Sequence, residues 1–139
     1  MTLVDSNILL DIFTRTPNWW EWALIQLEEA ALHGPLLIND VIYVETSVRF
    51  QSIDEFNAAL AVAGITVASM PRKALFLAGK AFARYRAAGG NRSTRTGVLP
   101  DFFIGAHAEL EGLPLLTRDA QRYRHYFPTV MWIAPKNEE

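Results

Sequence analysis

Residues 2–13 read TLVDSNILLDIF. The apolar residues up to Val4 predict a short buried strand, and the apolar side chains from Ile8 to Phe13 recur at helical spacing. An acidic residue, Asp5, lies between these two elements. A carboxylate that flanks an apolar element is drawn toward the core, where an unpaired charge is costly. The stretch therefore predicts a polar position at the carboxyl end of a buried strand.

The same alternation continues along the chain. Four more short apolar runs predict strands, at 36–38, 65–68, 115–117 and 130–133. Helical patterns fill the intervals, at 18–30, 39–50, 53–63, 73–88, 101–111 and 120–125. Asn18 is expected to cap its helix, and the polar stretch 91–99, with Arg92 and Arg95, is expected to form a loop. Strands that alternate with helices predict an α/β fold, with a mostly parallel five-stranded sheet and helices on both faces.

Composition narrows the class of protein. The chain has 139 residues, half of them hydrophobic, which is enough for one domain, expected at 1–134, with a short charged tail at 135–139. A net charge of −2 excludes binding of nucleic acid by bulk charge alone. The absence of cysteine excludes disulfides, thiol catalysis and cysteine-ligated metals. The longest apolar run is too short to span a bilayer, and no signal-peptide pattern is seen, so a soluble cytoplasmic protein is expected.

Four acidic residues flank the predicted apolar elements. Asp5 and Asp119 follow strands, and Glu45 and Asp101 lie on predicted helices. Sites in parallel α/β sheets lie at the carboxyl ends of strands, near a topological switch point, so the four acids are treated as one group. If they converge, their mutual repulsion requires a cation, and the natural choice is a hard divalent ion, Mg²⁺ or Mn²⁺.

Each acid also has an ordinary structural interpretation. Asp5, Asp101 and Asp119 are all suited to capping a helix or a turn. Glu45 can pair with Arg49 one turn further along its helix, and the residues alone favour that interpretation. The residues around each acid do not decide between these alternatives.

Three neighbouring polar residues are candidate supports for the acids. Asn7 is placed to cap the first helix or to position Asp5 by hydrogen bonding. Thr117 and Arg118 suit an exposed surface, although a hydroxyl and a guanidinium beside a metal also suit phosphate contact. No nucleophile elbow, P-loop or paired-histidine spacing competes with the acids.

Four segments, in this order, resemble those of PIN-domain ribonucleases, and most closely the VapC toxins of toxin–antitoxin systems. They are LVDSNILL at 3–10, INDVIYVE at 38–45, DFFIGAHA at 101–108 and LLTRD at 115–119. The resemblance implies a PIN-like fold, with Asp5, Glu45, Asp101 and Asp119 as catalytic residues. It raises Glu45 from a surface residue to a site residue.

The same resemblance implies a chemistry and partners. Asp5, Asp101 and Asp119 are expected to bind Mg²⁺ or Mn²⁺, supported by Asn7, Thr117 and Arg118. The expected reaction is hydrolysis of RNA, with tRNA or rRNA as substrate. A homodimer and an inhibitory antitoxin protein are expected as well.

Two rival functions differ in class from this one. The first is a catalytically inactive PIN-like module that binds RNA or protein, which the four intact acids disfavour. The second is a metal-dependent phosphatase, whose usual Asp-x-Asp motif is missing because Asn7 stands at its second position.

Overall fold

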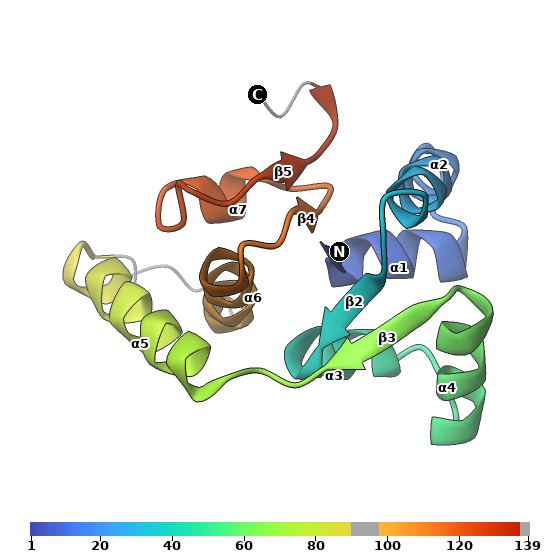
Figure 1. Ribbon diagram of the computed structural model, residues 1–139, viewed down its shortest axis with the longest axis horizontal. Helices are drawn as coiled ribbons and strands as arrows, with labels where there is room; N and C mark the ends of the chain where they lie inside the picture. The colour runs from blue at the N-terminus through green and yellow to red at the C-terminus, as the bar shows by residue number, and fades with distance from the viewer. Residues whose placement is uncertain (90–97, 137–139) are drawn as a thin grey trace.

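A parallel sheet forms the centre of the molecule (Figure 1). The computed structural model describes residues 1–89 and 98–136. All strand pairs are parallel, and the order across the sheet is β3-β2-β1-β4-β5. The strands are β1 (Thr2–Val4), β2 (Leu36–Asn39), β3 (Ile65–Ala68), β4 (Leu115–Leu116) and β5 (Trp132–Ile133). The prediction of a five-stranded α/β fold is confirmed.

Helices cover both faces of the sheet. They are α1 (Ser6–Thr14), α2 (Trp20–Ala31), α3 (Asp40–Ser47), α4 (Ile53–Val62), α5 (Arg72–Ala87), α6 (Val98–Glu111) and α7 (Gln121–Arg124). In Figure 1, α5, α6 and α7 lie to the left of the sheet, while α1, α2 and α4 lie to its right. This division follows from the right-handed crossover rule, because the chain crosses the sheet in one direction before β3 and in the other direction after it. Within the described ranges, no helix combines the length and apolarity that crossing a membrane requires.

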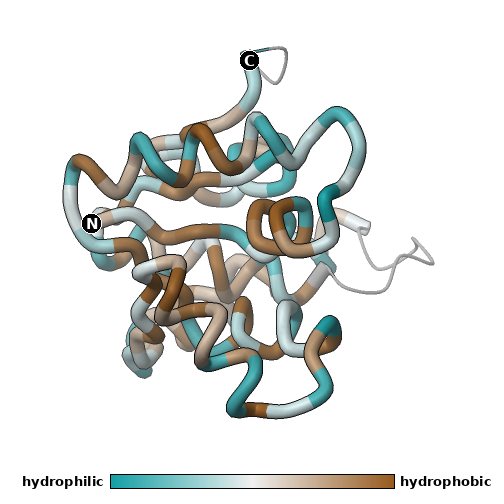
Figure 2. Tube along the Cα trace, turned by 90° about the vertical axis from the view of Figure 1, so that its right-hand side faces the viewer, coloured by the Kyte–Doolittle hydropathy of each residue, from teal (hydrophilic) through white to brown (hydrophobic). Residues whose placement is uncertain are grey.

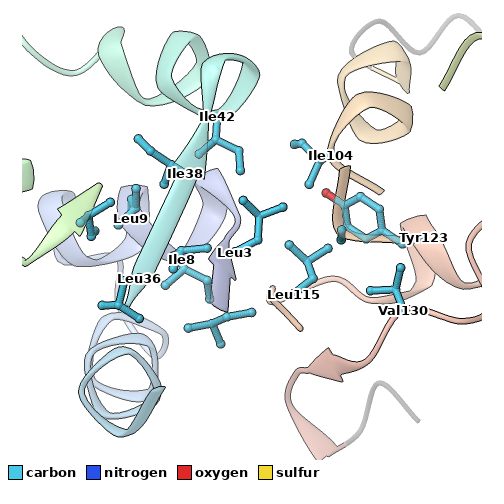
Figure 3. Close-up of a cluster of buried hydrophobic side chains, with 14 of the residues drawn as sticks. Leu3, Ile8, Leu9, Leu36, Ile38, Ile42, Ile104, Leu115, Tyr123 and Val130 are labelled. Carbon is cyan, nitrogen blue, oxygen red and sulfur yellow. The ribbon is translucent and has the colours of Figure 1, made fainter. Parts of the chain in front are cut away.

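The core lies against the central strands. Leu3 and Val4 of β1 are both fully buried, as expected for a strand that has neighbours on each side and helices on both faces. Figure 2 shows hydrophobic segments running through the middle of the molecule, with hydrophilic ones on the outer turns. Figure 3 shows apolar side chains from β1, β2, β4, α1, α3 and α6 gathered in one cluster, which also includes Tyr123.

Two helix starts differ by more than one residue from the sequence prediction. Asn18 has a positive φ of 72° and does not cap α2, which begins at Trp20 after Trp19. Helix α6 begins at Val98, so Asp101 lies within its first turn and is not its cap. The predicted loop therefore ends earlier than expected, and the part that holds Arg92 and Arg95 lies outside the described residues.

The topology has one switch point, between β1 and β4. From β1 the chain proceeds outward to β2 and β3, then returns to place β4 on the other side of β1 and continues to β5. Neighbouring connections diverge at such a point, and in parallel α/β sheets ligands bind beyond the carboxyl ends of the strands there. Asp5 follows β1 and Asp119 follows β4, so the fold brings both acids to this edge of the sheet.

A buried polar pair joins α6 to the start of α3. The Asn39 side chain caps α3 by accepting a hydrogen bond from the Ile42 amide at 2.9 Å, and its Nδ2 lies 3.1 Å from Nδ1 of His107. Since the Asn39 oxygen is already occupied, Nδ2 is the donor and the ring nitrogen accepts. His107 is buried, and burial lowers its pKa, although the charges of Glu111 and Asp40 act in the opposite direction.

This pair makes stability depend on pH. Because the folded protein favours neutral His107, its contribution is complete above the ordinary pKa of 6.5 and is lost as the pH falls through the lower folded value. We expect the free energy of unfolding to drop more between pH 7 and pH 5 in the wild type than in His107→Gln. Urea titrations across this range measure the difference, and His125→Gln, which changes an exposed ring, serves as the control. Parallel pH curves for wild type and His107→Gln would contradict the assignment.

Gly105 is required by close packing between α6 and the segment after α7. A Cβ at this position would overlap the ring of Phe127, which is itself buried. The helical glycine at 79 differs, since a Cβ there meets no atom within 4 Å. The two glycines therefore separate the effect of packing from that of backbone entropy.

Replacing each glycine by alanine should change stability in opposite directions. Gly105→Ala is expected to lower the free energy of unfolding by about 1–3 kcal/mol, because the ring of Phe127 must move. Gly79→Ala is expected to raise it by about 0.5–1 kcal/mol, because alanine is the better helix former. Chemical denaturation of the two variants tests this, and a stabilised Gly105→Ala would show that the close contact is absent.

Candidate active site

Asp5 is a fully buried carboxylate held by donors from three parts of the chain. It occupies the N-cap position of α1, and its Oδ1 accepts a hydrogen bond from the Ser6 amide at 2.7 Å. Its Oδ2 accepts from the hydroxyls of Thr117, at 2.8 Å, and Tyr123, at 2.7 Å. The capping role and the candidate site role thus coincide in one residue, and the carboxylate has a single fixed orientation.

Thr117 connects Asp5 to the loop that carries Asp119. Its hydroxyl donates to Asp5 and accepts from Asn7 Nδ2, at 3.3 Å, and from the Asp119 amide, at 3.1 Å. Asn7 also accepts a hydrogen bond from the Arg118 amide at 3.1 Å through its Oδ1. Asn7 therefore acts on Asp5 indirectly, and Thr117 is a buried residue and not the surface residue that its local sequence suggested.

Arg118 extends away from the acids toward α1 and α2. Its guanidinium lies 3.1 Å from the buried carboxylate of Asp11 and 5.1 Å from the centre of the Trp19 ring. This ion pair and the ring fix the side chain on one flank of the site. Arg118 is one-third exposed, so it still presents positive charge to solvent beside Asp119.

Glu45 is joined to Asp5 through Ser6. The Ser6 hydroxyl donates to Glu45 Oε1 at 2.9 Å and lies 3.5 Å from Asp5 Oδ1. Glu45 thus turns toward the other acids, instead of pairing along its own helix. Burial raises its pKa, and the charge of Asp5 raises it further, while the Ser6 hydrogen bond lowers it.

Asp101 and Asp119 face each other across a single arginine. Arg122, on α7, places Nε 2.9 Å from Asp119 Oδ2 and Nη1 3.6 Å from Asp101 Oδ1. Asp101 comes from the first turn of α6 and Asp119 from the turn before α7. The structure thus brings all four predicted acids to the carboxyl edge of the sheet.

The charges of the four acids act on one another. Burial raises the pKa of Asp101 to about 7, and the charges of Asp5, Glu45 and Asp119 contribute to the rise, while Arg122 opposes it. Burial also raises the pKa of Asp5, against the three hydrogen bonds that stabilise its charged form. Burial lowers the pKa of Arg122, but the charges of Asp101 and Asp119 outweigh this and raise it. Concentrated negative charge is the defining property of this edge.

The donor set fits a hard divalent cation by its chemistry, because it consists of carboxylate oxygens whose charges repel one another. Its geometry is not yet that of a metal site. In residues 1–89 and 98–136, no three acidic or histidine side chains are grouped closely enough to hold one ion. Side chains must therefore shift for a cation to be bound.

Three residues of the site were missed by the sequence analysis: Ser6, Arg122 and Tyr123. Ser6 lies directly after Asp5, and Arg122 stands three residues after Asp119, which is a usual spacing for an ion pair on a helix. Tyr123 gave no local signal, because its partner Asp5 lies 118 residues away. Its ring is fully buried and stacks on Trp132, with the ring centres 5.7 Å apart. Packing in the core therefore positions the Tyr123 hydroxyl against Asp5.

Comparison with known structures finds the same fold in several solved structures. This chain is similar to a chain of VapBC2 from Rickettsia felis bound to a promoter DNA fragment. The match has 16% identity and a TM-score of 0.70, and it covers 96% of this chain and 97% of the other. VapBC-1 from nontypeable Haemophilus influenzae gives 16% identity and 0.69, with 96% of each chain covered. FitAcB from Neisseria gonorrhoeae gives 15% and 0.64, again with 96% of each chain covered.

At these identities, the structural likeness shows the fold alone. No curated protein matches the chain. The family assignment rests on the sequence model described as the PIN domain, which matches residues 2–128. Since this match extends over most of the chain, the protein belongs to the PIN domain family.

Proposed function

We propose that this chain is a metal-dependent endoribonuclease and the toxin of a type II toxin–antitoxin system, of the VapC type. The observation that carries the proposal is the gathering of Asp5, Glu45, Asp101 and Asp119 at the switch point. There, burial raises the pKa of Asp101 to about 7, and the charges of the other three acids contribute to the rise. PIN domains are generally nucleases, and a phosphodiester can approach such a cluster only together with a cation.

In the proposed site, Asp5, Asp101 and Asp119 hold Mg²⁺ or Mn²⁺. The bound ion would lower the pKa of a water molecule and stabilise charge on the phosphate. The chain's own groups supply the orientation. Ser6, Thr117 and Tyr123 fix the Asp5 carboxylate.

Glu45 is the candidate to orient the attacking water. The Ser6 hydroxyl binds Oε1 of Glu45, which leaves Oε2 to accept a hydrogen bond from that water. Arg118, held by Asp11 and Trp19 on one flank of the site, is partly exposed and is a candidate to contact the RNA backbone. These roles assign binding to three acids and orientation to the fourth.

Support for the toxin assignment comes from the similar structures. They include a toxin–antitoxin complex from Klebsiella pneumoniae, with 22% identity and a TM-score of 0.57, besides the VapBC and FitAcB structures. By analogy, we infer a cognate antitoxin, a cytoplasmic location and a homodimer. Exposed apolar side chains on α3, at its C-cap and at the start of α4 offer surface for protein contacts; they are Val44, Val48 and Ile53.

The alternative function is an inactive PIN-like module that binds RNA or protein without cleaving it. It would not require four acids, nor a network that fixes Asp5. The two functions differ in a single measurable property, which is metal-dependent cleavage.

Cleavage of RNA provides the direct test. With Mg²⁺ or Mn²⁺, the wild type is expected to cleave tRNA or rRNA, while Asp5→Asn and Asp101→Asn lose on the order of a hundredfold or more in rate, because each removes a charge that binds the cation. Asp54→Asn, on the exposed start of α4, is the matched control and should retain full activity. The rates are followed on total RNA with EDTA as the metal-free reference. Equal cleavage by all four proteins would refute the nuclease assignment.

Growth of a bacterial host tests the toxin assignment separately. Induced expression of the wild type should arrest growth, and expression of Asp5→Asn should not, because the arrest requires cleavage. Co-expression of a short, DNA-binding protein encoded beside this gene should restore growth. Purified protein that cleaves RNA, yet leaves growth unaffected when expressed, would separate the nuclease from the toxin and reject the latter.

A further inference from the structure

Arg122 holds the position that a cation would take between two of the acids. Its side chain bridges Asp119, with Nε at 2.9 Å, and Asp101, with Nη1 at 3.6 Å. Among the ion pairs of the described residues, no other Lys or Arg side chain pairs with any of the four acids. Arg118, the other arginine at this edge, pairs with Asp11. Within residues 1–89 and 98–136, the positive charge in contact with the cluster thus comes from one side chain.

The contact is suited to exchange. Arg122 is 44% exposed and Asp119 is 40% exposed, so both can leave the pair for water. Asp101, at 15%, is less accessible, and its contact with the guanidinium is the longer one. Exposed ion pairs are weak because solvent competes for both partners. Arg122 is therefore not locked into the fold in the way that Tyr123 is.

We propose that Arg122 is an internal counterion of the acid cluster, which competes with the divalent cation for Asp101 and Asp119. The inference rests on the proposed function, in which these two acids bind metal. In the metal-free protein, the guanidinium reduces the repulsion among the carboxylates. On metal binding it must withdraw from the same oxygens, since two cations on one carboxylate repel each other.

This competition explains why the acids gather without forming a metal site. The arginine fork contacts both Asp101 and Asp119, and it occupies carboxylate oxygens that a bound cation would need. Metal binding then requires the displacement of Arg122. Because this displacement costs free energy, the affinity for metal is lower than it would be for the four carboxylates without the arginine.

Calorimetric titration with Mn²⁺, in the absence of RNA, tests the proposal. The variant is Arg122→Gln, and the matched control is Arg124→Gln, on the same helix and with the same loss of charge. We expect Arg122→Gln to bind Mn²⁺ on the order of fivefold more tightly than the wild type, as the loss of one exposed ion pair allows. Arg124→Gln should change affinity by roughly twofold or less, because in the described part of the chain Arg124 forms no ion pair with the four acids, and salt screens its charge.

Thermal unfolding supplies a second readout. In EDTA, Arg122→Gln should melt at a lower temperature than the wild type, because the acids then repel one another without a counterion. With saturating Mn²⁺ this difference should disappear or reverse. An arginine with a purely structural role would lower the melting temperature equally in both conditions, and that result would overturn the proposal.

The outcomes also distinguish this inference from the proposed function. Suppose that Asp101→Asn abolishes Mn²⁺ binding but Arg122→Gln binds Mn²⁺ no more tightly than the wild type. This result would overturn the role of Arg122 and leave the metal site standing. If Asp101→Asn leaves Mn²⁺ binding unchanged, both in the wild type and in Arg122→Gln, the metal site and the competition are both rejected. Circular dichroism of each variant verifies that it is folded.

Discussion

The burial of one carboxylate organises this edge of the molecule. Asp5 ends the central strand and has no access to water, so its charge depends on donors from the protein. Those donors come from the start of α1, the end of β4 and α7, through Ser6, Thr117 and Tyr123. Satisfying Asp5 therefore requires β1, β4 and the segment after β4 to be assembled correctly. The same three contacts place Asp119 and Arg122 at the switch point.

Charge is the second consequence of this arrangement. The carboxylate of Asp5 is connected to Glu45 through Ser6. Burial raises the pKa of Asp101, and the charge of Asp5 raises it further. Neutral hydrogen-bond donors stabilise one acid, but they do not compensate four. A cation is needed, and Arg122 supplies it in the structure described above. The fold thus leaves negative charge that a positive side chain, a metal ion or a partner protein can compensate.

The sequence predicted the features that follow from short-range patterns. Buried strands appear as apolar runs, so the sheet and the positions of Asp5 and Asp119 were predictable. Local reasoning failed for Glu45, because its partner Ser6 lies 39 residues away and the nearby Arg49 offered a simpler pair. It failed for Tyr123 and Thr117 for the same reason, since both contact Asp5 from more than 110 residues away. Asn18 was mispredicted because an asparagine that suits a cap also tolerates the left-handed conformation it adopts.

The acids differ in how firmly they are held, and this difference bears on how the site works. Asp5 is buried and bonded on both oxygens, whereas the Asp119 side chain is partly exposed and pairs with the exposed Arg122. A site with one rigid and several adjustable carboxylates does not present a finished coordination sphere. In the proposed metal site, the rigid acid would define where a cation lies, and the others would close around it as Arg122 withdraws. The free energy of displacing the arginine would then set the metal affinity, and the fixed geometry of Asp5 would set the position of the ion.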